Sequence, residues 1–315
     1  ELERNSARAD MFVQAFINGQ KWEDVVGSLD RMSQLKKSDI VAFANRYLKN
    51  NYVQVNKLQG VDETIQKMPK PKITPILTNR DTSSAFLKEI QTSTVKPIEP
   101  VFVDFKKDMS VLKGKSDIEV LYKQNSTNDL FNMAYLFDFG SNADKLLPIA
   151  VDYLSYLGTD KYTPDQIKQK FYNLAINYVF NVKEESTTLS LLGLVENMKE
   201  GAALLEELIA NAKPNDEVLA NFKKDILKGR ENAKAAQSVC FDRVENYIKY
   251  GPVNPATNIL SNKEIEALTS QQLVDKIKEV FSYKHIALFY GPASEKDFLA
   301  SFSEFHKVPE VLKPV

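Results

Sequence analysis

Two segments of this chain, 35–55 and 268–288, align with each other without a gap. The matched apolar pairs are Leu35/Leu268, Ile40/Leu273, Val41/Val274, Ala44/Ile277, Tyr47/Val280, Leu48/Phe281, Val53/Ile286 and Val55/Leu288. Each copy reads as a helix N-cap region, an amphipathic helix of about three turns and a short alternating strand. A unit of this size cannot bury its own apolar face, so we expect each copy to close a larger module.

The second copy is preceded by enough chain to form such a module, whereas only residues 1–34 precede the first. We therefore expect the chain to be part of a longer protein; the alternative is a chance match, because amphipathic patterns are common. No apolar run approaches the 18 or so residues of a membrane span. The sequence leaves the localisation open, with the bacterial cell envelope or periplasm compatible with it.

The composition restricts the functions that the chain can perform. The net charge of −1 provides no electrostatic footprint for nucleic acid or for an anionic membrane. The sole cysteine, Cys240, cannot form an internal disulfide, and we expect it to be a small, inert core residue. A chain of 315 residues is long enough for about two domains.

The sequence predicts four parts. Residues 1–60 read as helices followed by a strand, Tyr52–Leu58, and are expected to be the tail of a preceding α+β domain. Residues 61–100 contain no glycine and five prolines, a composition typical of an extended linker. Residues 101–291 form a second module, and residues 292–315 are expected to be an exit segment toward a following domain.

The second module combines a block of strands with a block of helices. Strands are predicted at 101–105, 118–122, 130–139, 176–182 and 186–195, and helices near 145–157, after Thr163-Pro164 and over 196–250. Both faces of the 130–139 strand are apolar, which predicts that it is covered at least in part on each side. This order favours an α+β fold in which helices pack on an antiparallel sheet.

Histidine is scarce, with only His285 and His306 present. Zinc hydrolysis needs three protein ligands, and no two histidines occur at helical spacing beside a Glu. We expect His285 to be half-buried packing and His306 to lack ligand partners. Carboxylate pairs such as Glu206-Glu207 are expected in turns or on solvated helical faces, where acid–base catalysis is disfavoured. The residues by themselves thus predict no metal, nucleophile or phosphate site.

The stretch 137–171 has one further pattern: Gly140-Ser141 ends a predicted strand, and Gly158-Thr159 follows a helix. This pattern resembles the inverted zinc motif of the pitrilysin and insulinase metallopeptidases, the inverzincins. In that family an apolar strand ends in Gly-Ser, and a helix bearing His-x-x-Glu-His is followed closely by Gly-Thr. The helix starts Lys36–Asp39 and Thr269–Gln272 likewise resemble the segment that closes the domains of that family.

The resemblance places Ile149 and Tyr153 at the two His positions and Asp152 at the Glu position. The third ligand of the family, a Glu, would fall near Glu231. The resemblance therefore implies a degenerate motif, with no catalytic and no metal-binding residue in this chain. Zinc would be held by the missing amino-terminal half of the same polypeptide.

The function that the resemblance implies is that of a fragment of a zinc-dependent metalloendopeptidase. The fragment itself would be non-catalytic and would serve as chamber wall, hinge and peptide-contact half. Its partners would be the catalytic amino-terminal half and the peptide substrate. One alternative is a non-enzymatic scaffold or assembly subunit of the same superfamily. Another is an α+β binding module without catalytic relatives.

Overall fold

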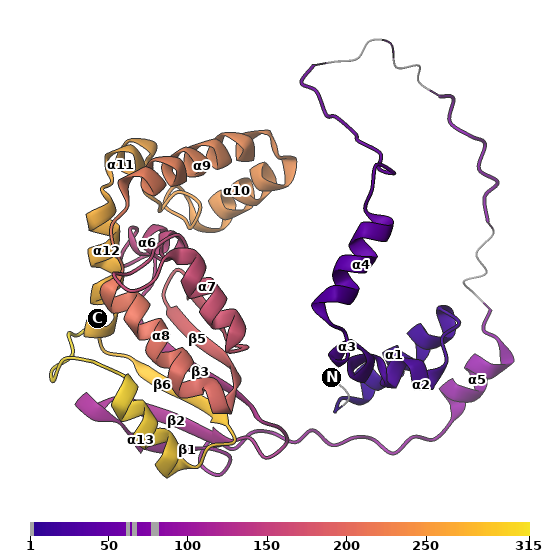
Figure 1. Cartoon of the computed structure of the whole chain (residues 1–315), viewed down its shortest axis with the longest axis horizontal. Coiled ribbons are helices and arrows are strands. Elements are labelled where there is room, and N and C mark those ends of the chain that lie inside the picture. Colours follow the sequence, from indigo (N-terminus) through magenta and orange to yellow (C-terminus); the bar gives the residue numbers. More distant parts are fainter. Residues whose placement is uncertain (1–2, 61–63, 65–67, 77–81) are drawn as a thin grey trace. The chain divides into compact units, whose positions relative to one another are not determined.

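The computed structural model describes residues 3–60, 64, 68–76 and 82–315, and the chain forms two compact units, Glu1–Val95 and Lys96–Val315. The described part of unit 1 contains helices and extended chain (Figure 1). Its helices are α1 (Asn5–Ile17), α2 (Trp22–Val26), α3 (Ser28–Ser33), α4 (Lys37–Tyr47) and α5 (Ala85–Thr92). The predicted linker, 61–100, therefore contains a short helix, and residues 61–63, 65–67 and 77–81 of it lie outside the described part.

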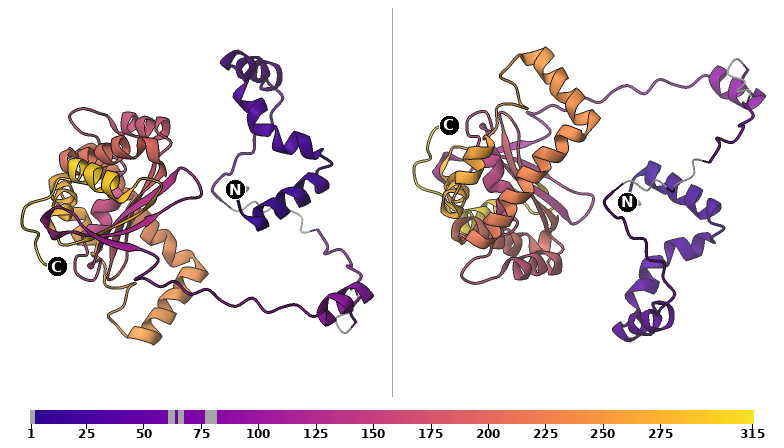
Figure 2. Two further views of the ribbon diagram at one scale, coloured as in Figure 1. Left: turned by 90° about the horizontal axis from the view of Figure 1, so that it is seen from below. Right: turned by 90° about the horizontal axis from the view of Figure 1, so that it is seen from above.

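Unit 2 is the α+β module that the sequence predicts. Its strands are β1 (Ser110–Lys113), β2 (Glu119–Gln124), β3 (Leu130–Phe137), β4 (Asn177–Val182), β5 (Thr187–Leu194) and β6 (Ile286–Gly291). Its helices are α6 (Leu147–Leu154), α7 (Pro164–Asn173), α8 (Met198–Asn211), α9 (Asp216–Ala235), α10 (Gln237–Tyr250), α11 (Asn262–Ala267), α12 (Ser270–Glu279) and α13 (Glu295–Phe305). The α9–α10 hairpin extends beyond the sheet (Figures 1 and 2).

The sheet has six strands in the order β1-β2-β6-β3-β5-β4. All neighbouring pairs are antiparallel except β2 and β6, which are parallel. Residue Ala134 of β3 lies opposite Ser190 of β5 and Leu288 of β6. The last strand in the sequence thus enters the centre of the sheet, so the fold of unit 2 is complete only when β6 is in place.

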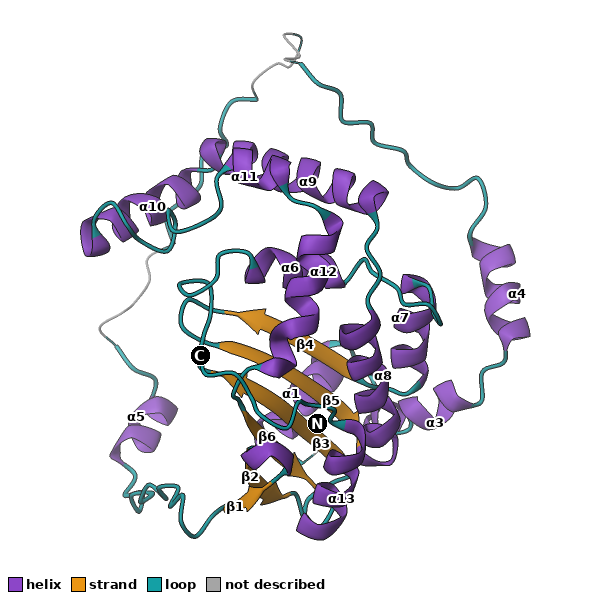
Figure 3. Ribbon diagram, turned by 90° about the vertical axis from the view of Figure 1, so that its left-hand side faces the viewer, coloured by secondary structure: helices purple, strands orange, loops and turns teal. Residues whose placement is uncertain are grey.

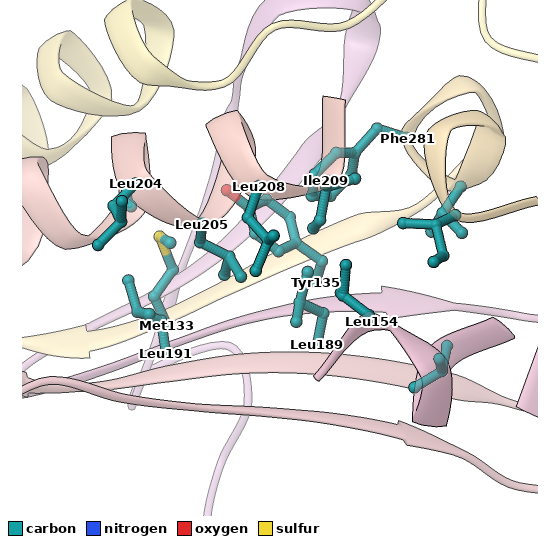
Figure 4. Close-up of a cluster of buried hydrophobic side chains, with 14 of the residues drawn as sticks. Met133, Tyr135, Leu154, Leu189, Leu191, Leu204, Leu205, Leu208, Ile209 and Phe281 are labelled. Carbon is teal, nitrogen blue, oxygen red and sulfur yellow. The ribbon is translucent and has the colours of Figure 1, made fainter. Parts of the chain in front are cut away.

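Helices pack on one face of this sheet (Figure 3). On that face, buried side chains of β3 and β5 pack against helix α8 (Figure 4). The cluster comprises Met133, Tyr135, Leu189, Leu191, Leu204, Leu205, Leu208 and Ile209, each at most 8% exposed. On the opposite face Leu130 and Tyr290 are about half exposed, with 52% and 47% of their surface accessible. The strand β3 is therefore covered on the face that meets the helices and only partly covered on the other face.

Local sequence signals explain several element boundaries. Helix α7 begins with Pro164 at its first position, and Thr163 and Gln166 form a reciprocal capping box before it. Helix α12 has a capping box of the same kind, in which the N-cap Thr269 pairs with Gln272. Each box satisfies backbone N–H groups that have no partner inside the helix, so both helices begin at a defined residue.

The internal repeat extends in the structure to two helices before the aligned segments, α1 and α3, whereas α2 has no helical counterpart at 255–259. Adding the 233-residue offset to the bounds of α1, α3 and α4 gives 238–250, 261–266 and 270–280, which match α10, α11 and α12 to within one residue. The strand half differs, because residues 52–58 are extended without an assigned strand, whereas their counterpart β6 is paired on both sides.

The two copies also differ in burial. Leu273 and Val274 of α12 are fully buried, whereas the matching residues of α4, Ile40 and Val41, are 57% and 48% exposed. The first copy therefore presents an apolar face that the second copy buries within its own module.

Two further expectations of the sequence differ from the structure. Residues 101–105 form no strand, and the edge strand is β1, which the sequence did not reveal. Residues 292–315 do not lead away from the module: α13 packs into the core through Phe298, Phe302 and Phe305. Aromatic residues at positions i, i+4 and i+7 place these three rings on one helix face, which explains why the segment folds back.

We predict that the replacement Phe302→Ala destabilises unit 2 by about 3 kcal/mol or more, because it removes a buried ring from the core. The matched control is Phe241→Ala, which removes a 68% exposed ring on α10 and should change the free energy of unfolding by less than about 0.5 kcal/mol. Urea denaturation of the two variants measures both effects. Equal, small effects would mean that α13 is not part of the core.

Candidate functional site

The positions of the degenerate motif on α6 differ in their surroundings. Ile149 is half-buried and packs against the core, and Asp152 lies on the exposed side of the helix. Neighbouring atoms still exclude part of the water around Asp152, and this desolvation raises the pKa of its carboxyl group. Tyr153, at the second His position, is fully buried.

The phenol of Tyr153 is held in a closed set of hydrogen bonds. Its hydroxyl donates to the carbonyl of Asn215, 2.7 Å away, and lies 3.0 Å from the hydroxyl of Ser270. The backbone N–H of Asn215 in turn donates to Ser270 Oγ over 2.6 Å. Asn215 is the N-cap of α9 and Ser270 opens α12, so this phenol joins α6 to the starts of two other helices.

Glu231 lies apart from the other motif positions. The residue of α9 that packs against Tyr153 is Phe222, whose ring centroid is 5.5 Å from that of the tyrosine. Glu231 is nine residues further along the helix, which is about 14 Å along its axis. Its carboxylate is exposed and forms an ion pair with Lys234 over 2.7 Å.

These residues do not fit a zinc ion. Ile149 offers no donor atom, Tyr153 already uses its hydroxyl in two hydrogen bonds, and Glu231 belongs to another part of α9. Among the described residues, no group of three or more His, Cys, Asp or Glu side chains could hold a metal ion. No catalytic step through a metal can therefore be derived from these positions.

The structure instead brings both histidines into a buried cluster that the sequence did not predict. Its members are Tyr135 of β3, Glu206 of α8, His285 just before β6, and His306 just after α13. All four are at most 7% exposed. We call these residues the buried quartet.

Glu206 is the centre of the buried quartet. Its Oε1 accepts a hydrogen bond from the Tyr135 hydroxyl over 2.8 Å and lies 2.6 Å from His306 Nδ1. Its Oε2 accepts from the backbone N–H of Lys307 over 2.9 Å. The Nε2 atoms of His306 and His285 are 3.0 Å apart, and Nδ1 of His285 lies 2.7 Å from the carbonyl of Tyr283.

Aromatic rings surround the quartet. Tyr135 and Phe302 stack on the His306 ring, at centroid distances of 4.7 and 4.9 Å, and Phe281 meets its edge at 5.0 Å. Burial lowers the pKa of His285 to about 4, and the nearby His306 contributes to this shift. Burial and the charge of Glu206 raise the pKa of the Tyr135 phenol well above its ordinary value, so the phenol stays protonated and donates.

Three expectations about these side chains were wrong. Glu206 is buried rather than solvated, and His306 has hydrogen-bond partners rather than none. Cys240, expected in the core, is exposed on α10. The available signal was weak: Glu206 follows Leu205 in an apolar stretch of α8, but its partners lie 71 to 101 residues away in the chain.

A cavity of about 1010 Å³ lies at the end of the sheet where β3 ends and β6 begins. His285 and Phe137 line one side of it, and Glu310, Val311 and Leu312 line another. In the described residues no helix is long and apolar enough to cross a membrane.

The fold of this chain occurs in solved peptidase structures. The peptidase M16 inactive domain from Pseudomonas fluorescens matches 63% of this chain with a TM-score of 0.54 and 18% sequence identity. The periplasmic protease PqqL from Escherichia coli matches 88% of the chain, with a TM-score of 0.54 and 14% identity. The ferredoxin protease FusC, in complex with Arabidopsis ferredoxin, matches 99%, with a TM-score of 0.58 and 10% identity.

The matched 63% of the chain has the fold of an M16 peptidase inactive domain. The chain spans 50%, 29% and 37% of these three solved chains, respectively. No protein-family model matches the sequence, and no curated protein matches it significantly. The mixed α+β architecture with helices packed on the sheet, as predicted, is confirmed.

We predict that Tyr153→Phe destabilises unit 2 by about 1–3 kcal/mol, because it removes a buried hydroxyl that is hydrogen-bonded to the carbonyl of Asn215 and to the buried hydroxyl of Ser270. The matched control is Tyr156→Phe, just beyond the end of the same helix, where the ring is 48% exposed and the expected change is within about 0.5 kcal/mol. Thermal or urea unfolding distinguishes the two variants. A neutral Tyr153→Phe would show that the phenol has no structural role.

Proposed function

We propose that this chain is a non-catalytic part of a zinc-dependent metallopeptidase of the pitrilysin and insulinase type. It would form chamber wall, hinge and peptide contacts, while the zinc site belongs to an amino-terminal half of the same polypeptide. The observation that carries the proposal is Tyr153: the position of a zinc-ligating histidine holds a phenol that joins three helices. The likeness in fold to an M16 inactive domain supports it.

The repeat supports the proposed domain order. Residues 1–60 match the last part of unit 2 in helix positions, which is what the tail of a preceding domain of related fold would show. Residues 61–100 would connect the two halves. Because α13 belongs to the core, we place the inactive domain at 96–315 rather than at 101–291.

A peptide or protein is the proposed ligand of the assembled protein. PqqL is described as a protease and FusC as a protease in complex with a ferredoxin, so proteins of this fold include some that act on other proteins. We propose that this chain contacts the peptide in the assembled protein.

The test compares the 315-residue chain with the intact protein to which it belongs, each assayed for zinc content and for cleavage of a quenched-fluorescent peptide, with and without a chelator. We expect about one zinc ion per intact protein with chelator-sensitive cleavage, since a catalytic zinc site needs three protein ligands and an open position. We expect neither property in the chain alone.

Two outcomes would contradict the proposal. Stoichiometric zinc in the 315-residue chain would show that its residues form a metal site after all. An intact protein that neither binds zinc nor cleaves peptides would favour the scaffold function instead.

A further inference from the structure

The hydrogen-bond partners of the buried quartet determine how many protons it holds. The carbonyl of Tyr283 can only accept, so Nδ1 of His285 carries a proton. The contact between the two Nε2 atoms needs one more proton, because two bare imidazole nitrogens 3.0 Å apart would oppose their lone pairs. A neutral imidazole carries a single ring proton, and that of His285 is on Nδ1. The proton between the two Nε2 atoms is therefore bound to Nε2 of His306.

The remaining nitrogen of His306 decides the charge of the quartet. Glu206 accepts from Tyr135 and from the backbone of Lys307, and hydrogen bonds of this kind stabilise the ionised carboxylate. Nδ1 of His306 then donates to that carboxylate, so His306 is an imidazolium paired with Glu206. The charges cancel inside the core, and each polar atom of the quartet has a partner.

A second proton has no place in this arrangement. If His285 bound one, its Nε2–H would point at the Nε2–H of His306, and two imidazolium rings would be adjacent. Glu206 on α8 contacts His306 directly, and Tyr135 on β3 stacks on the His306 ring. The other groups near the pair that can carry a charge line the cavity beside His285, and they are Asp117, Glu119, Asp138, Lys284 and Glu310. Phe281, Phe137 and Phe302 provide the remaining neighbours of the two rings and carry no charge.

The quartet lies where the carboxy-terminal segment is attached. His306 directly follows α13, and the chain then continues along the wall of the cavity to Leu312. The segment is also attached through the backbone of Lys313, which pairs with Ser282 and Lys284 over 2.8 and 2.9 Å. Its polar side-chain contacts lie nearer the surface. One is the ion pair of Lys199 with Glu304 over 2.6 Å, in which both side chains are more than half exposed, and such pairs contribute little. Another is the donation by Ser116 Oγ to the carbonyl of Pro309 over 2.7 Å.

We propose that the buried quartet is an acid-sensitive latch, which fastens α13 and residues 306–315 to the sheet and opens when His285 is protonated. With the latch open, α13 and the segment that follows it loosen while the sheet stays folded. This device is independent of the peptidase proposal, because it follows from the four side chains alone.

The direction of the pH effect follows from the pKa of His285. In the closed state this pKa is about 4, whereas an exposed histidine in the open state has a pKa near 6.5. The open state therefore binds more protons below pH 6.5, and opening becomes more favourable as the pH falls toward 4. Between pH 7 and pH 4.5 the pKa difference of His285 alone favours opening on the order of 50-fold. His306 already holds its proton in the closed state and gains it only on acidification in the open state, so the net rise should be about 10-fold.

Amide hydrogen exchange of the full 315-residue chain tests the latch. The protection of 295–306 is compared at pH 7 and pH 4.5, after correction for the intrinsic exchange rate at each pH. Protection should fall by roughly 10-fold in this segment. It should stay nearly constant in α7, which serves as the reference helix within the same unit.

Two variants separate the latch from general acid destabilisation. In His285→Gln the amide oxygen can accept from His306 Nε2 but does not titrate, so the acid-induced fall in the protection of 295–306 should disappear. In Lys199→Gln only the exposed ion pair is lost, and the response should remain. If His285→Gln responded as the unmodified chain does, the latch would be excluded. Should the variant fail to fold, the unmodified chain still decides: no change in 295–306, or an equal change in α7, would overturn the proposal.

Discussion

The arrangement of unit 2 depends on the hydrogen bonds that the buried carboxylate of Glu206 accepts. An ionised carboxylate in an apolar core is unfavourable unless it is paired and fully hydrogen-bonded. Glu206 meets that condition only when β3 provides Tyr135 and the end of α13 provides both His306 and the N–H of Lys307. Elements 71 to 101 residues apart must therefore be in place together. Removing one partner would leave a buried charge without compensation, which is why the network specifies one packing of α13.

The sequence predicted the features that depend on local patterns. The alternation of Phe131, Met133, Tyr135 and Phe137 identifies the buried face of β3, and Thr163-Pro164 marks the start of α7. The repeat correctly predicted related helices at both ends of the chain. The first two signals lie within a single element, and the repeat emerges when one segment is compared with another. All of them can be recognised without knowledge of the tertiary contacts.

What the sequence could not show depends on contacts between distant residues. Glu206 and Glu207 are adjacent on α8, yet one is buried and the other only partly so, because α8 turns Glu206 toward β3 and α13. The edge strand β1 has four residues, SVLK, in which polar and apolar residues do not alternate. The apolar face of α4 looks the same as that of α12 in sequence, and only the structure reveals that one is exposed and the other covered.

Tyr153 and the buried quartet show that buried polar side chains of unit 2 have structural roles. Tyr153 joins α6 to α9 and α12, and Glu206 joins β3 to α8 and α13. These two side chains connect helices to each other or to the sheet. Among the described residues, no group of three or more His, Cys, Asp or Glu side chains could hold a metal ion. Buried polar side chains therefore connect the elements of unit 2 in two separate places.

The most direct test of this account is the protonation state of the two imidazole rings, observed by long-range ¹H–¹⁵N correlation spectroscopy at pH 7. The account predicts that both ring nitrogens of His306 carry protons and that His285 is neutral with its proton on Nδ1. Two neutral rings would contradict it, because Glu206 would then have to hold the proton and the core would contain no ion pair.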